Sequence, residues 1–432
     1  MLKKSSETST YVSLSEFNRS VSTEKVGFFR KLFAFIGPGV LVSIGYMDPG
    51  NWATGIEGGS KFGYQLLWIM LLSNLMAILL QSLTIKLGIV TQKDLAQACR
   101  DYYSKPVSLA LWVLCEIAII ACDLAEVLGC ALGLKLLFGI NLLTAVVITS
   151  LDVLLLLLLQ SWGIRALEAI ITVLVLSIFS CFVIELYMAK PNVGEIANGF
   201  IPSALNQEAL YIAVGILGAT VMPHNLYLHS SLVQTRDITQ NAKSVKEAIK
   251  YNIIDTVLSL NTSLFINASI LIVAATVFYR QNIVVDELTQ AHVMLNRTLG
   301  GAAAVAFALA LFLSGQSSTY TGTLAGQIVM EGFLKLQLKK WQRRLITRSL
   351  AIIPAIIMVV LKGEKGSKDL LIFSQVVLSM QLPFAIVPLI YFTSSQKYMG
   401  EFKNSLVVKI LSVLTAIIII GLNIWLLTKV IF

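Results

Sequence analysis

Runs of about 20 apolar residues recur along almost the whole of the 432-residue sequence. A helix needs roughly 20 such residues to cross the hydrocarbon core of a bilayer. Only 13% of the residues are charged, against roughly 25% in an ordinary soluble domain. The pattern therefore predicts an all-α polytopic membrane protein. We expect eleven transmembrane helices, at about 33–58, 64–87, 107–134, 141–160, 164–188, 208–234, 252–279, 300–330, 346–361, 369–393 and 406–430.

The net charge of +9 comes from basic residues that gather in alternate connections between these spans. Most of the 33 Lys and Arg residues fall in the N-terminal segment and in the connections on the same side of the membrane. Because basic connections stay in the cytoplasm, we expect a cytoplasmic N-terminus and, after eleven spans, an extracellular C-terminus. This distribution indicates the lipid bilayer as a partner, and it does not indicate a nucleic acid.

The domain organisation follows from the lengths of the connections. None of them is long enough for a second domain, so residues 31–432 are expected to form a single transmembrane domain. Residues 1–30 are rich in Ser, Thr and charge. A segment of that composition buries too little apolar surface to fold alone, and we interpret it as a disordered cytoplasmic tail.

Two short interruptions lie deep inside predicted spans. Residues 48–51 (Asp-Pro-Gly-Asn) interrupt the first span, and residues 222–224 (Met-Pro-His) interrupt the sixth. Because the sixth span follows the first by five, an odd number, the two spans run in opposite directions. Paired breaks in antiparallel spans indicate a five-plus-five inverted repeat with the binding site at the breaks. The first repeat would cover about 31–190 and the second about 205–395, and the span at 406–430 would be additional.

The first interruption places a carboxylate where lipid disfavours charge. Asp48 lies about 22 Å along its span at ~1.5 Å per residue, within a hydrocarbon layer about 30 Å thick. An ionised side chain at that depth needs a cation, a proton or a basic partner. Pro49 and Gly50 break the helix in the first span, and Pro223 breaks it in the sixth. Because proline has no N–H group, the carbonyl of Ala219, one turn earlier, becomes available as an oxygen ligand.

The groups beside these breaks fit a divalent transition-metal ion. Asp48, Asn51 and the freed carbonyl of Ala219 offer oxygen ligands that suit many hard cations. The Met222 thioether disfavours Ca²⁺ and Mg²⁺ and favours, in relative terms, Mn²⁺, Fe²⁺, Co²⁺, Ni²⁺, Zn²⁺ or Cd²⁺. Each side chain also has a structural alternative: Met222 as core packing, Asp48 as a helix cap, and Asn51 as a partner of the broken backbone.

Ionisable side chains continue from the breaks into neighbouring parts of the chain. Asp123 and Glu126, three residues apart in the third span, share one helix face. His224 and His229 lie in the sixth span, and Arg236 follows at its cytoplasmic end. Acids and histidines within a membrane mark a proton relay or an internal ion pair. A proton passing from His224 to Glu126 and Asp123 and a static salt-bridge network therefore stand as alternatives.

Four of the five cysteines lie within predicted spans, and no Cys-x-x-Cys pair occurs. We therefore expect no disulfide bond. Cys115, Cys122 and Cys130 are spaced by seven and eight residues, so they could share one helix face. We interpret them as small buried core residues in preference to a thiolate metal site.

The motifs at residues 48–51 and 222–224 resemble the signature pair of the Nramp family of proton-coupled divalent-metal transporters, in its bacterial manganese-transport type. The stretches 81–88 (Gln-Ser-Leu-Thr-Ile-Lys-Leu-Gly) and 381–385 (Gln-Leu-Pro-Phe-Ala) agree with that family, and the resemblance runs from about residue 30 to the end. It implies a LeuT-type fold with broken helices 1 and 6, and import of Mn²⁺ or Fe²⁺ with protons by alternating access. It also implies a functional monomer in the plasma membrane of a prokaryote, with no cofactor beyond the transported ion.

The resemblance also implies roles for individual residues. Metal binding is implied for Asp48, Asn51, the carbonyl of Ala219 and Met222, and Gln375 in the tenth span is added as a ligand in some conformations. The expected cargo is Mn²⁺, with Fe²⁺, Cd²⁺ and Co²⁺ as further ions and with Ca²⁺ and Mg²⁺ excluded. A polar passage toward the cytoplasm is implied for Asp123, Glu126, His224, Arg236 and Arg344.

Three other functions fit the sequence less well. A Na⁺-coupled amino-acid symporter with the same broken helices is the nearest, but an Asp beside a thioether does not suit a substrate carboxylate. A membrane metalloenzyme would show several His ligands, as in His-Glu-x-x-His. The chain has three His and no such motif, so we expect no enzyme. A metal sensor would need a cytoplasmic output domain, and no connection is long enough to form one.

Overall fold

The computed structural model describes residues 13–23, 27–149, 162–285, 287–336, 340–362 and 365–431. Its elements in chain order are β1 (Val21–Ser22), α1 (Phe28–Phe35), α2 (Pro38–Gly45), α3 (Pro49–Phe62), α4 (Leu67–Thr91), α5 (Leu95–Tyr102), α6 (Lys105–Phe138), α7 (Leu142–Thr149), α9 (Ile164–Ala189), α10 (Val193–Gly199), α11 (Gln207–Thr220), α12 (Pro223–Leu232), η1 (Val233–Thr235), β2 (Arg236–Asp237), α13 (Ala242–Val277), η2 (Tyr279–Gln281), α14 (Leu288–Leu299), α15 (Gly301–Leu334), α16 (Lys340–Lys362), α17 (Lys365–Ser394), α18 (Gln396–Met399), η3 (Gly400–Phe402) and α19 (Leu406–Ile431).

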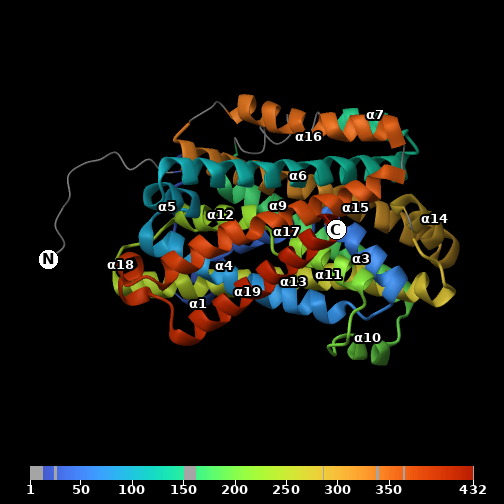
Figure 1. Ribbon diagram of the computed structural model, residues 1–432, viewed down its shortest axis with the longest axis horizontal. Helices are drawn as coiled ribbons and strands as arrows, with labels where there is room; N and C mark the ends of the chain where they lie inside the picture. Colours follow the sequence, from blue (N-terminus) through green and yellow to red (C-terminus); the bar gives the residue numbers. More distant parts are fainter. Residues whose placement is uncertain are drawn as a thin grey trace.

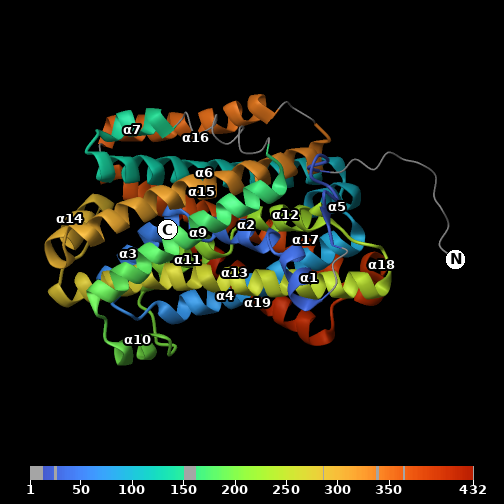
Figure 2. The same ribbon diagram turned by 180° about the vertical axis from the view of Figure 1, so that it is seen from behind.

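Most of the long helices run along the longest axis of the molecule (Figures 1 and 2). In both views α5 and α18 lie at one end, and α10 and α14 lie at the other. We call these the α5 end and the α14 end. Helices α7 and α16 contact each other and form a layer outside α6 (Figure 1).

Eight helical segments of the described residues are long and apolar enough to cross a membrane, and α1 with α2 passes the same test as a ninth, bent span. Of the two other expected spans, 141–160 begins with α7 and then continues outside the described residues. The span expected at 346–361 lies in α16, whose apolar part, Ser349–Leu361, is short. The prediction of an all-α polytopic membrane protein is confirmed. The eight segments are Leu67–Thr91, Lys105–Phe138, Ile164–Ala189, Gln207–Thr235, Ala242–Gln281, Gly301–Leu334, Asp369–Ser394 and Leu406–Thr428.

The centre of the molecule is formed by helices that approach one another closely. Helix α6 packs along α15, α13 packs against α3 and α4, and α11 packs against α17. A Cβ atom at Gly315 of α15 would lie 2.6 Å from the sulfur of Cys130, and one at Gly129 of α6 would overlap the ring of Pro49. These glycines therefore allow α6 to reach both α15 and the start of α3, where the first interruption lies.

The first expected span, 33–58, is divided into three helices by two breaks, of which the prediction covered only one. The chain bends by 45° between α1 and α2, at Ile36 and Gly37. A second break, over residues 46–48, separates α2 from α3. Gly37 has a φ of 141°, a conformation that side-chain-bearing residues rarely adopt. The pair Gly37-Pro38 is a turn signal that the interpretation of this stretch as one span overlooked.

The N-terminal segment differs from its prediction. We expected residues 1–30 to form a disordered tail, but residues 13–23 pack against the bundle and α1 begins at Phe28. Leu14, Phe17 and Val21 are 2%, 6% and 6% exposed. Strand β1 pairs in parallel with β2, directly after the sixth span. These three apolar side chains supply the buried surface that the overall composition of the segment conceals; residues 1–12 lie outside the described part of the chain.

Candidate metal site at two helix breaks

The two predicted interruptions lie side by side in the structure. Helix α2 ends at Gly45 and α3 begins at Pro49, while α11 ends at Thr220 and α12 begins at Pro223. Each proline occupies the first position of its helix, where the missing N–H group costs nothing. The C-terminal ends of α2 and α11 therefore bring partly negative carbonyl groups to the same place. That arrangement favours a cation between the breaks.

Asp48 is fully buried and holds its position through neutral partners. Its Oδ1 atom accepts hydrogen bonds from the backbone N–H of Asn51 at 3.0 Å and from Asn51 Nδ2 at 2.7 Å. Its Oδ2 atom accepts from Gln375 Nε2 at 3.0 Å. The side chain thus caps α3, which was the structural alternative. It has no cationic partner among the ion pairs of the described residues, so no positively charged side chain described there neutralises an ionised Asp48.

Asn51 links the two breaks. Its Nδ2 atom donates to Asp48 and also to the carbonyl oxygen of Ala219, at 2.9 Å. The amide nitrogen therefore lies between two of the oxygen atoms that were predicted to bind metal. The Oδ1 atom of Asn51 faces the other way and accepts a long hydrogen bond, 3.4 Å, from Asn267 Nδ2. Asn267 also donates to the carbonyl of Tyr46, at 2.7 Å.

Gln375 of α17 reaches Asp48 because residue 50 is glycine. A Cβ atom at Gly50 would overlap Nε2 of Gln375, so any larger residue would displace the glutamine. The Oε1 atom of Gln375 is buried and has no hydrogen-bond partner among the described residues. A buried amide oxygen without a partner is costly, and it is available to a ligand in the site.

Met222 caps the start of α12 without a side-chain hydrogen bond and is fully buried. It forms a small apolar cluster with Ala118, Cys122 and Leu378. The core-packing alternative for this residue is therefore realised in this conformation. Met222 nevertheless lies at the break between α11 and α12, directly after Val221, which is where the sequence predicted a metal ligand.

A chain of polar groups leads from the break to the third span. The Sγ atom of Cys122 lies 3.8 Å from Nε2 of His224 and 3.4 Å from Oε1 of Glu126. Asp123 and Glu126 both face α15, because a Cβ atom at Gly322 would lie 3.2 Å and 3.1 Å from their carboxylate oxygens. Cys122, interpreted above as a core residue, thus connects the predicted proton-transfer residues. Its position four residues before Glu126 was the sequence signal for this contact.

A second polar chain starts from His229. Its Nδ1 atom lies 2.9 Å from Oε1 of Gln81, and Gln81 Nε2 donates to the Tyr46 hydroxyl at 2.7 Å. Tyr46 lies two residues before the first interruption. His229 is therefore connected to the site through α4, although neither Gln81 nor Tyr46 was predicted as a site residue.

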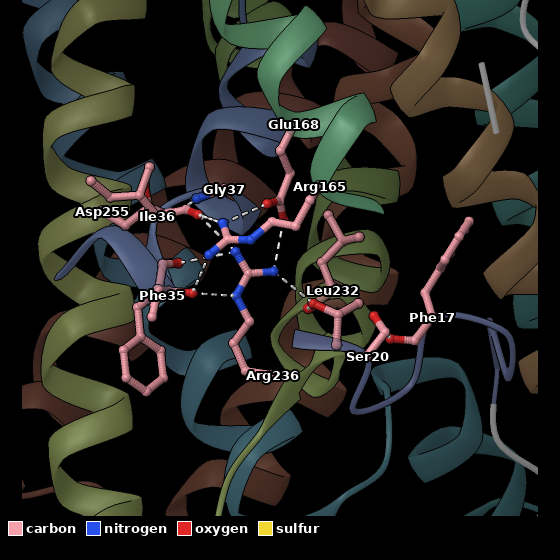
Figure 3. A network of polar contacts seen from close by, with 12 residues as sticks. Phe17, Ser20, Phe35, Ile36, Gly37, Arg165, Glu168, Leu232, Arg236 and Asp255 are labelled. Atoms are coloured by element: carbon pink, nitrogen blue, oxygen red, sulfur yellow. Dashed lines mark hydrogen bonds and ion pairs between the residues drawn. The ribbon is translucent and has the colours of Figure 1, made fainter. Parts of the chain in front are cut away.

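Arg236, for which the resemblance implies a place in the polar passage, makes its described contacts at the bend between α1 and α2. Its guanidinium group is 0% exposed and pairs with Glu168 Oε1 at 2.7 Å. It also donates to the carbonyl groups at the end of α1, to Ala34 at 3.1 Å and to Ile36 at 2.7 Å (Figure 3). Its described contacts therefore stabilise the bend between α1 and α2. Arg344 belongs to α16, but its side chain lies outside the described residues.

The bend carries further charged caps that the sequence analysis left without a role. Arg165 donates to the carbonyls of Phe33 at 3.0 Å and Ile36 at 2.8 Å and pairs with Glu168 at 2.9 Å. On the other side of the bend, Asp255 accepts from the backbone N–H groups of residues 37 and 39, at 3.1 Å and 2.8 Å. Figure 3 shows this network between α1, α9 and α13.

The ligand set of the site is small. No group of three or more His, Cys, Asp or Glu side chains that could hold a metal ion occurs among the described residues. The candidate ligands are one carboxylate, two amides, a backbone carbonyl and a thioether. Such a set suits an ion that is bound and released rather than a resident metal, which proteins hold with several charged or imidazole ligands.

The bundle and its paired breaks define the class: a multi-pass membrane protein with the LeuT-type fold. The transporter Mhp1 of the nucleobase-cation-symport-1 family has the same fold, with a TM-score of 0.61 at 16% identity over 87% of this chain and 80% of that chain. The family model described as "Natural resistance-associated macrophage protein-like" matches residues 39–429. The chain belongs to this family, Nramp, as the motifs at the two breaks predict.

Individual relatives agree with this assignment. The chain is 57% identical to the divalent metal cation transporter MntH of Nostoc sp., over 96% of both chains. It is 55% identical to the natural resistance-associated macrophage protein 2 homolog of Dictyostelium discoideum over 94% of its own length, and it spans 65% of that protein. A mutant of the Eremococcus coleocola manganese transporter superposes with a TM-score of 0.89 at 41% identity, over 95% of this chain and 90% of that chain.

Proposed function

We propose that the protein is a secondary transporter that imports divalent transition-metal ions, Mn²⁺ above all, together with protons. The observation that carries this proposal is Asp48: a buried carboxylate at a helix break, supported only by neutral amides. A buried charge without a partner is strongly unfavourable, so the site requires a cation or a proton from outside. The relatives' printed names, divalent metal cation transporter and manganese transporter, support a metal ion as that cation.

Ion binding requires a rearrangement of the two amides. The cation takes the place of the two hydrogen bonds that Asn51 Nδ2 donates to Asp48 and Ala219. Rotation of the Asn51 amide then presents its oxygen to the ion. Gln375 rotates in the same way, because its unpartnered Oε1 atom is the better ligand and its nitrogen would face the cation otherwise. The ion thus exchanges hydrogen bonds for coordination bonds without unfolding either helix.

Selection against Ca²⁺ and Mg²⁺ rests on Met222 in this proposal. The thioether lies at the start of α12 with apolar neighbours. A sulfur ligand stabilises Mn²⁺, Fe²⁺, Co²⁺ and Cd²⁺ more than it stabilises the harder alkaline-earth ions. Discrimination then arises because Ca²⁺ and Mg²⁺ lose hydration without gaining an equivalent ligand.

Protons leave the site through the polar chain that starts at His224. The cation at Asp48 disfavours the protonated carboxyl group, and the displaced proton moves by way of His224 and the Cys122 thiol to Glu126 and Asp123. The chain of His229, Gln81 and Tyr46, which runs from α12 through α4 to the residues before the first break, offers a second route. Arg236 and Arg344 tune the closing of the inner end rather than accept protons.

The remaining predictions concern how the protein sits in its membrane. We infer that the α5 end, where residues 13–23 pack, faces the cytoplasm, because the basic connections gather on that side. The protein then works as a monomer in the plasma membrane of a prokaryote, with its C-terminus outside. Residues 31–190 and 205–395 form the two inverted repeats, and α19 is the additional helix. The lipid bilayer, protons and the metal ion are its partners.

One experiment tests the proposal. The purified protein is reconstituted into liposomes with a pH dye inside, and Mn²⁺ uptake is measured with Fe²⁺, Cd²⁺, Co²⁺, Ca²⁺ or Mg²⁺ as competitor. We expect uptake with acidification of the interior, competed by the first three ions and not by the last two. Uptake without acidification would remove the proton from the proposal. Absence of Mn²⁺ accumulation, or Na⁺-dependent uptake of an amino acid instead, would overturn the assignment.

A further inference from the structure

Residues 13–23, which we call the N-terminal strap, contact several helices at the α5 end. The apolar anchors Leu14 and Phe17 are buried in the main core. The backbone N–H of Leu14 donates to Glu331 of α15 at 3.0 Å, and that of Arg19 donates to the carbonyl of Gln234 at 3.0 Å. The strap therefore joins α15, a helix of the eighth expected span, to the end of the sixth.

The second half of the strap pairs with the residue that holds the bend. Strand β1 runs parallel to β2 with Val21 opposite Arg236 and Ser22 opposite Asp237. The Thr23 hydroxyl also donates to the carbonyl of Asp237. Because Arg236 belongs to β2, the strand pair fixes its backbone while its side chain reaches α1.

The side chain of Arg236 connects the strap to the first span. It donates to the carbonyls of Ala34 and Ile36 at the end of α1 and pairs with Glu168 of α9 (Figure 3). Helix α1 leads directly through α2 to the break at Asp48. A movement of α1 away from the bundle would open a path from the α5 end to the site, and it would have to break these contacts.

We propose that the N-terminal strap is a latch that keeps the α5 end closed and is released whenever that end opens. The strap pairs with β2, and Arg236 of β2 binds the end of α1, so the strap stabilises the position of α1 through Arg236. The inference rests on the proposed transport function only in assigning the opening to a transport cycle. The occupant of the latch site is residues 13–23 of the chain itself, which the structure places there.

A reversible cross-link tests the release. Ser22 and Asp237 are exposed register partners, and register partners in a strand pair, about 4.8 Å apart, lie within the range that a disulfide bridges. The double variant Ser22→Cys/Asp237→Cys is oxidised before reconstitution. We expect at least a tenfold loss of Mn²⁺ uptake in the oxidised form and recovery after reduction. Ser22→Cys alone is the control, and all five natural cysteines are buried. Equal uptake in the oxidised and reduced double variant would overturn the latch.

A second measurement is independent of transport. Ala34→Cys, at a position 4% exposed, reports opening of α1 by its rate of reaction with a bulky maleimide. Phe17→Asp puts a charge on the buried anchor, whereas Ser15→Asp puts the same charge on an exposed position of the strap. We expect labelling at least fivefold faster with Phe17→Asp and unchanged with Ser15→Asp. Unchanged labelling in both would contradict the proposal.

The two outcomes separate the latch from the proposed function. Absence of uptake in the unmodified protein contradicts transport, and the labelling experiment then still decides the latch. Normal uptake in the reduced protein that persists after oxidation contradicts the latch alone. If Phe17→Asp fails to fold, the cross-linking experiment still tests the latch. It changes only two exposed positions and leaves the core intact.

Discussion

The two breaks in the first span are stabilised in opposite ways. At the bend between α1 and α2, the freed carbonyls accept from Arg165 and Arg236, and the freed N–H groups donate to Asp255. At the break between α2 and α3, the groups around Asp48 are neutral amides. One break is therefore closed by permanent opposite charges, and the other keeps a negative charge without a cationic partner among the described residues.

In the proposed function, this difference separates a hinge from an ion-binding site. A broken helix within a membrane must find partners for its exposed backbone groups. When charged side chains of the protein are these partners, the break requires no bound ion, and it serves to bend the chain. When the partners are amides that can rotate and a carboxylate remains unbalanced, we propose that an ion binds reversibly at the break.

The largest effect is expected from the carboxylate at the site. Asp48→Asn removes the charge but keeps an oxygen that can cap α3, so the fold should persist. We expect Mn²⁺ affinity in calorimetry to fall at least ~100-fold, about 3 kcal/mol. The matched change Asp255→Asn, at the hinge, should leave the affinity within about threefold. Equal losses in both variants would show that the two breaks do not differ as proposed.

The next effect concerns the stability of the hinge. Arg236→Gln leaves Glu168 with the half-exposed Arg165 as its remaining partner. Removal of one member of a buried ion pair costs about 3 kcal/mol or more, so the melting temperature in detergent should fall clearly while Mn²⁺ affinity stays unchanged. Arg165→Gln is the control: its side chain is 45% exposed, and the loss should be smaller. A larger loss of affinity than of stability in Arg236→Gln would place Arg236 in the site after all.

The sequence predicted the residues whose presence in a membrane is costly. Asp48, Pro49 and Pro223 interrupt apolar runs, and the high free energy of such groups in lipid was enough to identify both breaks. Asn51 and the carbonyl of Ala219 followed from the same argument, and the structure brings them together. These features are local, so periodicity and chemistry were sufficient to find them.

The sequence could not predict contacts that depend on which helix faces meet. Cys122 lies between His224 and Glu126, and Glu168 pairs with Arg236, because α6, α9 and α12 pack as they do. Nothing in the spacing of single residues determines such pairings across the chain. The strap was missed for a different reason: average composition concealed a few apolar anchors in a polar segment.

A smaller effect tests selectivity at the site. Met222→Leu keeps the volume in the apolar cluster but removes the sulfur, which makes it a cleaner change than Met222→Ala. We expect the ratio of Mn²⁺ to Ca²⁺ affinity to fall about tenfold, mainly because Ca²⁺ is no longer disfavoured. Met76→Leu, in the main core, is the matched control and should change nothing. If Met222→Leu retains the native ratio in competition binding, the thioether has no part in selectivity.

The smallest effect concerns the orientation of the Asn51 amide. In this conformation Asn267 holds the Asn51 oxygen away from Asp48 through a hydrogen bond of 3.4 Å. Asn267→Ala releases that oxygen and makes its rotation toward a cation easier. A net hydrogen bond contributes roughly 0.5 kcal/mol at the weak end, so we expect Mn²⁺ affinity to rise about twofold in calorimetry. Asn74→Ala is the control, because Asn74 lines a small cavity together with Asn51 and Asn267 but pairs with Asn261. A fall in affinity with Asn267→Ala would mean that Asn267 supports the ion-binding orientation, and the amide exchange proposed for the site would then be wrong.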